Sequence, residues 1–353
     1  MPGATTGSAL KILYVAGLSP NDSSLYRVWA LERLGHTVVS LNTYPYEPKW
    51  SLLRKVWFRA QLGPWVTRLN RDILALARAE KPDIVWADKV LSMQPETLKK
   101  LHAMGIVTVS YMIDNAFGPR RDPGWRLYRK CIPYYDLHAT QRDQNVLDYK
   151  ACGARDVIKI QTAYEPSIHF ASPTPVTDAE RTRGVSFVGT PYDQRAAFLT
   201  RLWRERGFPV VVSGDNTWTH KLDPEAAAAI YTGGELYQQG YREAMWHSKI
   251  NLSFLTHSNQ DEFVHKSFEI TGCGGFLLAE RSPGHSARFV EDEEAVFFSD
   301  FDECAEKIAR YLPDEAARNR IAAAGHARAL RDGYSNDAQV EKILAHVTPL
   351  LSR

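Results

Sequence analysis

The feature that most constrains the fold is an alternation of short apolar segments with amphipathic ones, and this alternation starts twice. Residues 11–17, KILYVAG, and residues 184–189, GVSFVG, are compact apolar runs that end in glycine. Each run is followed by a polar loop and then by apolar residues at helical spacing, at 25–34 and at 196–206. A strand, a loop, a helix and a further strand in succession predict a parallel sheet. The chain is therefore expected to be of the α/β class, with one such sheet in each half.

Other segments continue the alternation in both halves. Strands are expected at 36–41, 83–87, 106–111, 137–140, 157–160, 209–213, 250–255, 276–279 and 296–298. Helices are expected at 95–104, 145–150, 237–245, 266–271, 301–311, 313–329 and 340–351.

The length of 353 residues favours two domains. We expect an N-terminal domain at 1–165 and a C-terminal domain at 184–353, whose last helix could pack back on the N-terminal domain. Residues 166–183 contain three prolines and little apolar content, which is typical of a linker. His169 lies in this segment and is expected to be a surface or packing residue more than a catalytic one.

Composition excludes several classes of protein. The formal net charge of +2 gives no general reason to bind nucleic acid. The four cysteines lie far apart, which argues against disulfides or a zinc site. The N-terminal residues lack the pattern of a signal peptide, and no apolar run is long enough to span a membrane. A soluble, cytoplasmic protein is the expectation.

Residues 260–280, QDEFVHKSFEITGCGGFLLAE, carry the densest set of candidate site residues. Asp261 and Glu262 precede the expected helix, Lys266 and Glu269 lie on it, and a glycine turn follows. Carboxylates accept hydrogen bonds from vicinal hydroxyls, lysine neutralises phosphate, and glycine lets backbone N–H groups approach an anion. The set suits a polyhydroxyl ligand that carries phosphate, such as a nucleotide sugar. The alternative is a solvated helix start whose charges face water.

The same stretch resembles the nucleotide-contacting motif of retaining GT-B glycosyltransferases, an acid and a glutamate separated by seven residues and followed by small residues. It looks most like the spore-maturation-protein (CgeB-like) branch of the group 1 glycosyl transferases, through Lys266, Phe268, Glu269, Cys273 and Gly274. Two departures are the adjacent acids Asp261 and Glu262 and a lysine where arginine is common.

The resemblance implies roles for these residues. Glu269 would hold the ribose hydroxyls, Lys266 the diphosphate together with the turn at Gly272 and Gly274, and Asp261 or Glu262 the donor sugar. The fold would be GT-B, two Rossmann-like domains that face each other across a cleft. The activity would be transfer of a sugar from a UDP- or GDP-linked donor to a hydroxyl-bearing acceptor, which could be a glycan, a small molecule, a lipid-linked sugar or a protein.

The resemblance also favours retention of configuration, with no cofactor and no metal. The expectation that transfer needs no metal rests on the assumption that the chain has no D-x-D motif to hold a divalent ion. Two alternatives stay open: a sugar-nucleotide epimerase, which would turn over without an acceptor, and a binding protein that keeps the nucleotide pocket without catalysis.

The starts of the two halves supply further candidates. In the second half, the backbone at Gly189 and the side chain of Arg195 are expected to face the diphosphate, although Arg195 could equally form a surface ion pair. In the first half, an acceptor-side cleft is expected at Gly17, Ser23, Ser24 and Arg27. The two serines fit an ordinary helix cap about as well.

Asp114 follows the expected strand at 106–111, where α/β enzymes place working groups. It is a candidate base near the acceptor. An Asx turn or a helix cap explains it nearly as well.

Residues 49–81 contain eight Lys or Arg against two acidic residues, with three tryptophans between them. The part from Lys49 to Arg71 could rest on an anionic membrane surface or grip an acidic acceptor. The alternative is a pair of amphipathic helices whose tryptophans pack under the domain.

Overall fold

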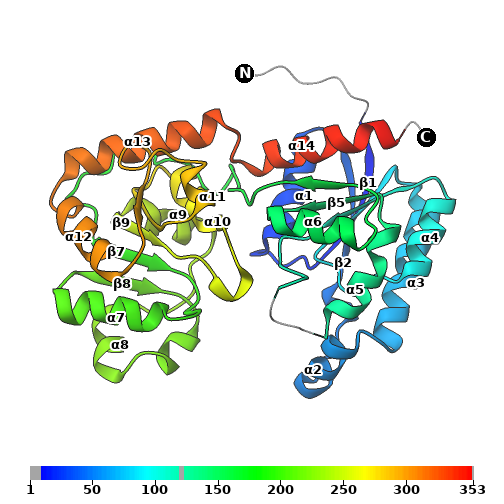
Figure 1. Ribbon diagram of the computed structural model, residues 1–353, viewed down its shortest axis with the longest axis horizontal. Helices are drawn as coiled ribbons and strands as arrows, with labels where there is room; N and C mark the ends of the chain where they lie inside the picture. Colours follow the sequence, from blue (N-terminus) through cyan, green and yellow to red (C-terminus); the bar gives the residue numbers. More distant parts are fainter. Residues whose placement is uncertain (1–8, 119–122, 352–353) are drawn as a thin grey trace. The chain divides into compact units, whose positions relative to one another are not determined.

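The computed structural model describes residues 9–118 and 123–351 (Figure 1). The chain divides into two compact units. The first is Met1–Gln161 together with Asn336–Arg353, and the second is Thr162–Ser335. The second unit therefore includes the whole segment 166–183 that was expected to be a linker, and the last helix belongs to the first unit.

The first unit is built on a parallel six-stranded sheet in the order β2-β1-β3-β4-β5-β6. Its strands are β1 (Lys11–Ala16), β2 (Thr37–Asn42), β3 (Ile84–Asp88), β4 (Val107–Tyr111), β5 (Leu137–Thr140) and β6 (Val157–Lys159). Its helices are α1 (Ser23–Arg33), α2 (Ser51–Ala60), α3 (Pro64–Glu80), α4 (Pro95–Ala103), α5 (Trp125–Cys131), α6 (Asp143–Ala151) and α14 (Asn336–Val347).

Alternate residues of β1 face two different cores. Ile12 and Tyr14 lie in a buried cluster with residues of α1 and α14, including Val28 and Ile343. Leu13 and Val15 lie in a second cluster with residues of α3 and α4. This alternation follows from the period of two along a strand, and it places helices on both faces of the sheet.

The second unit has a parallel five-stranded sheet in the order β11-β10-β9-β7-β8. Its strands are β7 (Arg183–Val188), β8 (Val210–Ser213), β9 (Ser248–Ser253), β10 (Leu277–Glu280) and β11 (Val296–Phe298). Its helices are α7 (Arg195–Arg206), α8 (Pro224–Ile230), α9 (Gln238–Trp246), α10 (His265–Gly272), α11 (Pro283–Ser286), α12 (Phe301–Tyr311) and α13 (Glu315–Arg331).

The prediction of an α/β chain with a parallel sheet in each half is confirmed. The expected linker differs most from the structure. Residues 166–182 form no helix or strand, but side chains of this segment pack: Ile168 and His169 are buried in the second unit. Asp178 also pairs with Lys249 at 2.6 Å.

Candidate functional site

The stretch singled out by the sequence forms a helix and a turn that lead into β10. α10 spans His265–Gly272, and Gly274 follows it with a φ of +70°. A left-handed residue at this place ends a helix and favours glycine. Gly272 lies against Tyr164, since a Cβ on it would come within 2.8 Å of the tyrosine ring. Both glycines thus have a structural explanation in the turn.

Lys266 and Glu269 lie one turn apart on α10 and share a partner. The Tyr241 hydroxyl, on α9, donates to the Glu269 Oε2 at 2.6 Å, and the Lys266 ammonium donates to the same hydroxyl at 3.2 Å. The Lys266 Nζ also lies 5.1 Å from the centre of the Tyr241 ring and 5.5 Å from that of Phe187. A cation, a phenol and a carboxylate are therefore joined in one cluster, which we call the Lys266–Tyr241–Glu269 cluster.

The cluster has perturbed acidities with physical causes. Burial lowers the pKa of Lys266 to about 8, and the nearby charge of Arg195 adds to this, while Glu269 opposes it. Burial by itself would raise the pKa of Glu269, but the charges of His169 and Lys266 and the hydrogen bond from Tyr241 outweigh it and lower that pKa. At neutral pH the site holds an ionised carboxylate beside a lysine that still carries its proton.

Gly189 follows β7 and lies beside the lysine. Its φ is +149°, and a Cβ on it would lie 3.6 Å from the Lys266 Nζ. Its N–H donates to the Ser213 carbonyl at 2.9 Å, and its carbonyl accepts from the Trp218 indole N–H at 2.7 Å. The Gly189 N–H and carbonyl are thus part of the fold, and the expected approach of a diphosphate to the backbone around Gly189 stays a prediction.

Arg195 is the first residue of α7 and is buried. Its guanidinium donates to the carbonyls of Thr190 at 3.2 Å, Phe254 at 3.3 Å and Leu255 at 3.1 Å, and to the Thr256 hydroxyl at 3.1 Å. Burial lowers the pKa of Arg195. The side chain holds the loop after β9 in place, and its charge reaches Lys266 through space. Its expected contact with a diphosphate stays a prediction.

Asp261 and Glu262 lie in the loop between β9 and α10 and are half-buried. The Asp261 Oδ1 accepts from the Asn259 amide at 2.9 Å, and its charge acts on Arg195. The Glu262 carbonyl accepts from the Ser282 hydroxyl. Asp261 therefore belongs to the electrostatic surroundings of Arg195.

Two residues near Glu269 were not identified by sequence reasoning. Tyr241 carries no motif, and His169 was expected to be a surface or packing residue of a linker. The His169 ring lies edge-on to the Tyr241 ring with centroids 5.4 Å apart, and its Nδ1 accepts from the Glu165 N–H at 3.0 Å. Burial lowers the pKa of His169. No spacing rule finds these two side chains, because the contact is between a helix and an irregular segment.

The candidates of the first unit lie at the carboxyl end of its sheet. The Ser24 hydroxyl donates to the Gly17 carbonyl, and the Arg27 Nη2 donates to the Ser23 hydroxyl at 3.4 Å. Arg27 is buried and pairs with Asp88 at 2.7 Å. Asp114 is half-buried and its carboxylate lies 3.7 Å from the Lys89 ammonium.

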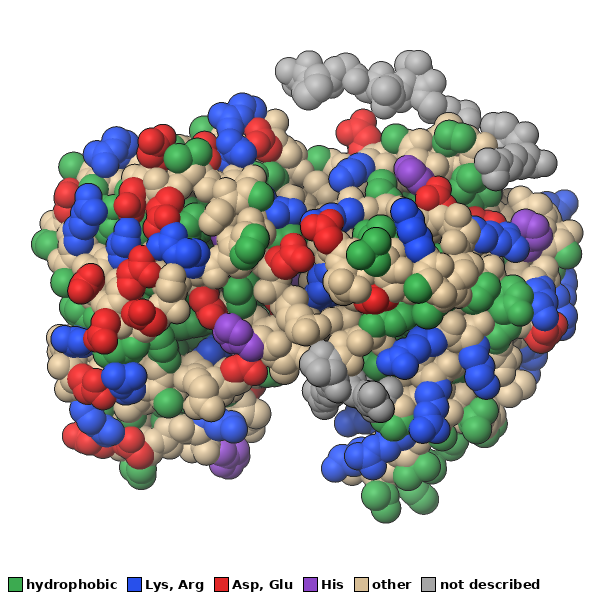
Figure 2. Space-filling view, in the orientation of Figure 1, with side chains coloured by type: hydrophobic (Ala, Val, Ile, Leu, Met, Phe, Trp, Pro, Cys, Tyr) green, Lys and Arg blue, Asp and Glu red, His purple; other side chains and the backbone are tan. Residues whose placement is uncertain are grey.

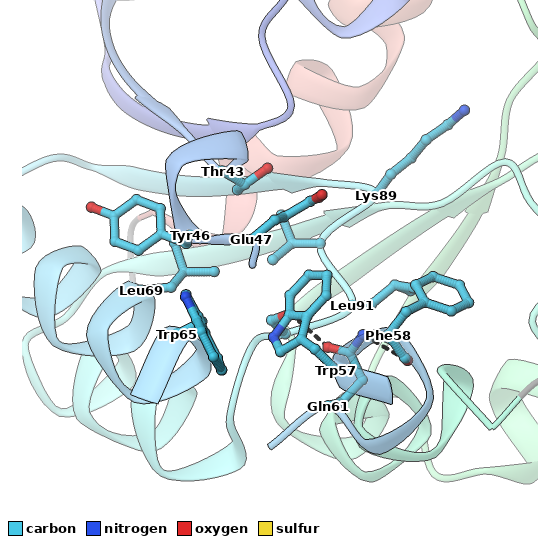
Figure 3. A pocket seen from close by; sticks show the side chains of 12 residues that line it. Thr43, Tyr46, Glu47, Trp57, Phe58, Gln61, Trp65, Leu69, Lys89 and Leu91 are labelled. Atoms are coloured by element: carbon cyan, nitrogen blue, oxygen red, sulfur yellow. Dashed lines mark hydrogen bonds between the residues drawn. The ribbon is translucent and has the colours of Figure 1, made fainter. Parts of the chain in front are cut away.

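The same unit also contains a pocket of about 180 Å³ (Figure 3). Aromatic rings from α2, α3 and the segment after β2 line it, among them Tyr46, Trp57 and Trp65. Glu47 and Lys89 add charged groups at its wall, and burial raises the pKa of Glu47. Apolar rings with a few polar groups are typical of ligand pockets.

A pocket of similar volume lies in the second unit, at the carboxyl ends of β9, β10 and β11. Arg195, Glu280 and His257 line it together with Phe198 and Phe254. The His257 Nε2 lies 2.6 Å from the Glu280 carboxylate.

The assumption that the chain lacks a D-x-D motif was wrong, because Asp300, Phe301 and Asp302 have that spacing. Asp300 caps α12 by accepting from the Glu303 N–H at 2.9 Å, and Asp302 pairs with Arg206 at 2.5 Å. Within residues 9–118 and 123–351, no three His, Cys, Asp or Glu side chains are grouped so as to hold a metal ion.

All four cysteines are free thiols. In the part of the chain that the structure describes, no helix has both the length and the apolar character needed to cross a bilayer.

Comparison with known proteins supports the glycosyltransferase expectation. Residues 194–345 match the model of a family described as glycosyl transferase-like, which is less than half of the chain. No curated protein matches the sequence.

Solved structures match over the whole length. Sucrose-phosphate synthase from Thermosynechococcus elongatus has a TM-score of 0.71 at 12% identity, covering 98% of this chain and all of that one. The Anabaena protein HepE in complex with UDP and glucose has a TM-score of 0.65 at 13% identity, covering 96% and 100%. The UDP-forming trehalose-phosphate synthase from Burkholderia xenovorans has a TM-score of 0.65 at 13% identity, covering 98% and 99%.

At this level of identity the neighbours establish the fold, and the family match covers the region that contains the Lys266–Tyr241–Glu269 cluster. The assignment to the spore-maturation-protein branch stays a prediction. The chain has the GT-B fold, and residues 194–345 are similar to a glycosyl transferase-like family.

Proposed function

We propose that the protein is a glycosyltransferase that moves a sugar from a nucleotide-activated donor to a hydroxyl-bearing acceptor. The observation that carries the proposal is the Lys266–Tyr241–Glu269 cluster, inside the region that matches the glycosyl transferase-like family. An ionised carboxylate accepts hydrogen bonds from two vicinal hydroxyls, and a protonated lysine neutralises phosphate. The cluster therefore suits a ribose and a diphosphate at neighbouring positions.

The donor is proposed to be UDP- or GDP-linked. Glu269 would bind the ribose, Lys266 the diphosphate, and Asp261 or Glu262 the sugar. HepE is described in complex with UDP and glucose, and the Burkholderia synthase is described as UDP-forming, which favours UDP as the first nucleotide to try.

Transfer is proposed to retain configuration and to need no metal or cofactor. The bond from the anomeric carbon to the diphosphate breaks, and a bond from that carbon to the acceptor oxygen forms on the same face. The acceptor proton passes to the departing phosphate oxygen, so no side-chain base is needed, and Lys266 stabilises the charge of the leaving group. Proton NMR of the product anomer tests this, and an inverted configuration would refute it.

The acceptor is proposed to bind to the first unit. The pocket lined by Tyr46, Trp57 and Trp65 supports this, because aromatic faces and a few polar groups suit a ring that carries hydroxyls. The proposed acceptor position is therefore beside α2 and α3. The cleft expected at Gly17, Ser23, Ser24 and Arg27 stays the alternative, although Ser24 donates to Gly17 and Arg27 donates to Asp88.

The experiment is a thermal-shift screen with UDP, GDP, ADP, TDP and CMP on the unmodified chain, Glu269→Ala and Glu243→Ala. Glu243 is a glutamate of α9 that accepts from Gln239 and serves as the matched control. We expect one nucleotide to raise the melting temperature of the unmodified chain and of Glu243→Ala, but not of Glu269→Ala, because binding to the folded state stabilises it. No stabilisation by any nucleotide would count against the proposal.

A further inference from the structure

α2 leaves an unusual concentration of apolar side chains at the surface. Of the fourteen exposed large hydrophobic residues in the described part of the chain, six lie between positions 50 and 62. Trp50 is 79% exposed, Leu52 75%, Val56 55% and Leu62 69%. Single exposed apolar residues are ordinary, but a contiguous patch marks an interaction surface.

The helix is attached to its unit by one side. Trp57 and Gln61 lie one turn apart and face the pocket behind the helix (Figure 3). The Gln61 side chain is buried and accepts from the Ser92 hydroxyl at 2.6 Å. No residue of α2 itself is buried. The inner side is thus anchored by Trp57 and Gln61, Phe58 also lines the pocket, and the other residues of the helix are exposed.

The outer side is amphipathic. Leu52 and Val56 are four positions apart and share one stripe, while Lys55 and Arg59 share the neighbouring stripe. Lys49 and Arg54 add further positive charge, and residues 48–63 contain no Asp or Glu. Figure 2 shows hydrophobic and basic side chains next to one another where α2 lies at the lower edge of the first unit.

We propose that α2 and the residues beside it, 49–62, dock the protein on an anionic lipid surface. Apolar side chains flanked by Lys and Arg, on a short helix, fit a bilayer interface with negative headgroups, where the apolar stripe enters the acyl boundary and the basic stripe meets phosphate. Charge complementarity decides between occupants. A second copy of the chain would bring the same positive charges against these, which disfavours a symmetric contact.

The proposal goes beyond the proposed transfer reaction and does not depend on it. It bears on the acceptor, because Trp57 lies both on the docking helix and in the wall of the acceptor-side pocket. An acceptor held in or on a membrane would be presented next to that pocket.

The test is flotation of the full chain with vesicles of phosphatidylcholine alone and of equimolar phosphatidylcholine and phosphatidylglycerol. We expect binding to the anionic vesicles only, falling as salt rises because exposed charges are screened. Leu52→Ser/Val56→Ser removes the apolar stripe, and Lys55→Glu/Arg59→Glu reverses the basic one. Each double variant should weaken binding at least about tenfold. For Lys55→Glu/Arg59→Glu the reason is that each basic residue near the surface contributes roughly a fivefold factor to the binding constant.

Matched controls carry the same chemistry elsewhere in the first unit. Leu147→Ser changes a leucine of α6 that is 60% exposed, and Lys100→Glu reverses an exposed lysine of α4. Both should float like the unmodified chain. Melting temperatures, and the thermal shift with the nucleotide, should be unchanged in all variants, so loss of flotation cannot be ascribed to unfolding or to a failed donor site.

Three results would overturn the proposal. In the first, the unmodified chain does not float with anionic vesicles. In the second, it floats equally with both vesicle types. In the third, the α2 variants float as well as the unmodified chain. Sedimentation equilibrium adds a fourth: self-association that Leu52→Ser/Val56→Ser abolishes, in the absence of lipid binding, would assign the patch to a second copy of the chain.

Discussion

At the scale of single residues, the protonation of Lys266 should govern the pH dependence of nucleotide binding. Its pKa of about 8 in the free protein lies below that of an ordinary lysine. A bound diphosphate favours the charged form and raises this pKa, so the binding free energy that Lys266 contributes is complete below about pH 8 and falls as the pH rises through it. Calorimetric titration with the stabilising nucleotide between about pH 7 and about pH 10 measures this loss.

Lys266→Arg is the control for that measurement, because a guanidinium stays protonated over the whole range. The affinity of this variant should change little where that of the unmodified chain falls. An equal decline in both proteins would show that another group titrates.

Tyr241 is the second residue on which the cluster depends. Tyr241→Phe keeps the ring but removes the hydroxyl that bonds Glu269 and Lys266. Loss of a hydrogen bond to a charged group costs about 1.5 kcal/mol or more, so nucleotide affinity should fall roughly tenfold. Tyr237→Phe is matched, since Tyr237 is an exposed tyrosine that donates to Glu235 at 2.6 Å. Unchanged affinity in Tyr241→Phe would mean that the hydroxyl does not position Glu269.

Of the residues in the cluster, the sequence identified only Lys266 and Glu269, which both lie on α10. Lys266 and Glu269 belong to one local motif on one helix, so their spacing carries the information. Tyr241 and His169 join them through tertiary contacts that have no local pattern. Arg195 was expected just before the helix at 196–206 and is the first residue of α7, but its hydrogen bonds to Phe254 and Leu255 depend on where β9 ends, which spacing does not give.

At the scale of elements, α1 and β3 are joined by a buried ion pair. The Arg27 and Asp88 side chains are 1% and 0% exposed, and the Tyr14 hydroxyl also donates to Asp88. Arg27→Met would leave the Asp88 carboxylate buried without its cation, which costs about 3–5 kcal/mol of unfolding free energy. Urea unfolding followed by circular dichroism measures the change.

Two controls test whether the loss comes from the unpaired charge. Arg27→Met/Asp88→Leu removes both charges and should recover much of the stability. Arg33→Met breaks the half-exposed pair with Asp337 and should cost at most about 1 kcal/mol. If the double variant is no more stable than Arg27→Met, burial of an unpaired charge is not the cause.

Elements were predicted better than their grouping into units. The expected strand at 184–189 and the helix at 301–311 correspond closely to β7 and α12, because their periodicity is local. The sequence allowed the last helix to pack back on the N-terminal domain. That α14 does join the core of the first unit, and that residues 166–183 pack in the second, follow from contacts between distant segments. A proline-rich segment indicates that helices and strands are disfavoured there. It does not indicate against which hydrophobic core the segment packs.

At the scale of the whole molecule, each unit has its own buried cores, so we expect two unfolding transitions in scanning calorimetry. Ile343 of α14 and Ile308 of α12 are both fully buried, one in each unit. Replacing either by alanine should cost about 2–5 kcal/mol and lower one transition by several degrees. Ile343→Ala should lower the transition of the first unit, although α14 is the last helix of the chain.

The nucleotide then identifies the two transitions. If the Lys266–Tyr241–Glu269 cluster is the donor site, the stabilising nucleotide should raise the transition that Ile308→Ala lowers and leave the other in place. A single transition that both substitutions lower equally would show that the two units unfold together. A nucleotide-dependent rise of the Ile343-sensitive transition alone would instead locate nucleotide binding in the first unit, and the role given to Glu269 would have to be abandoned.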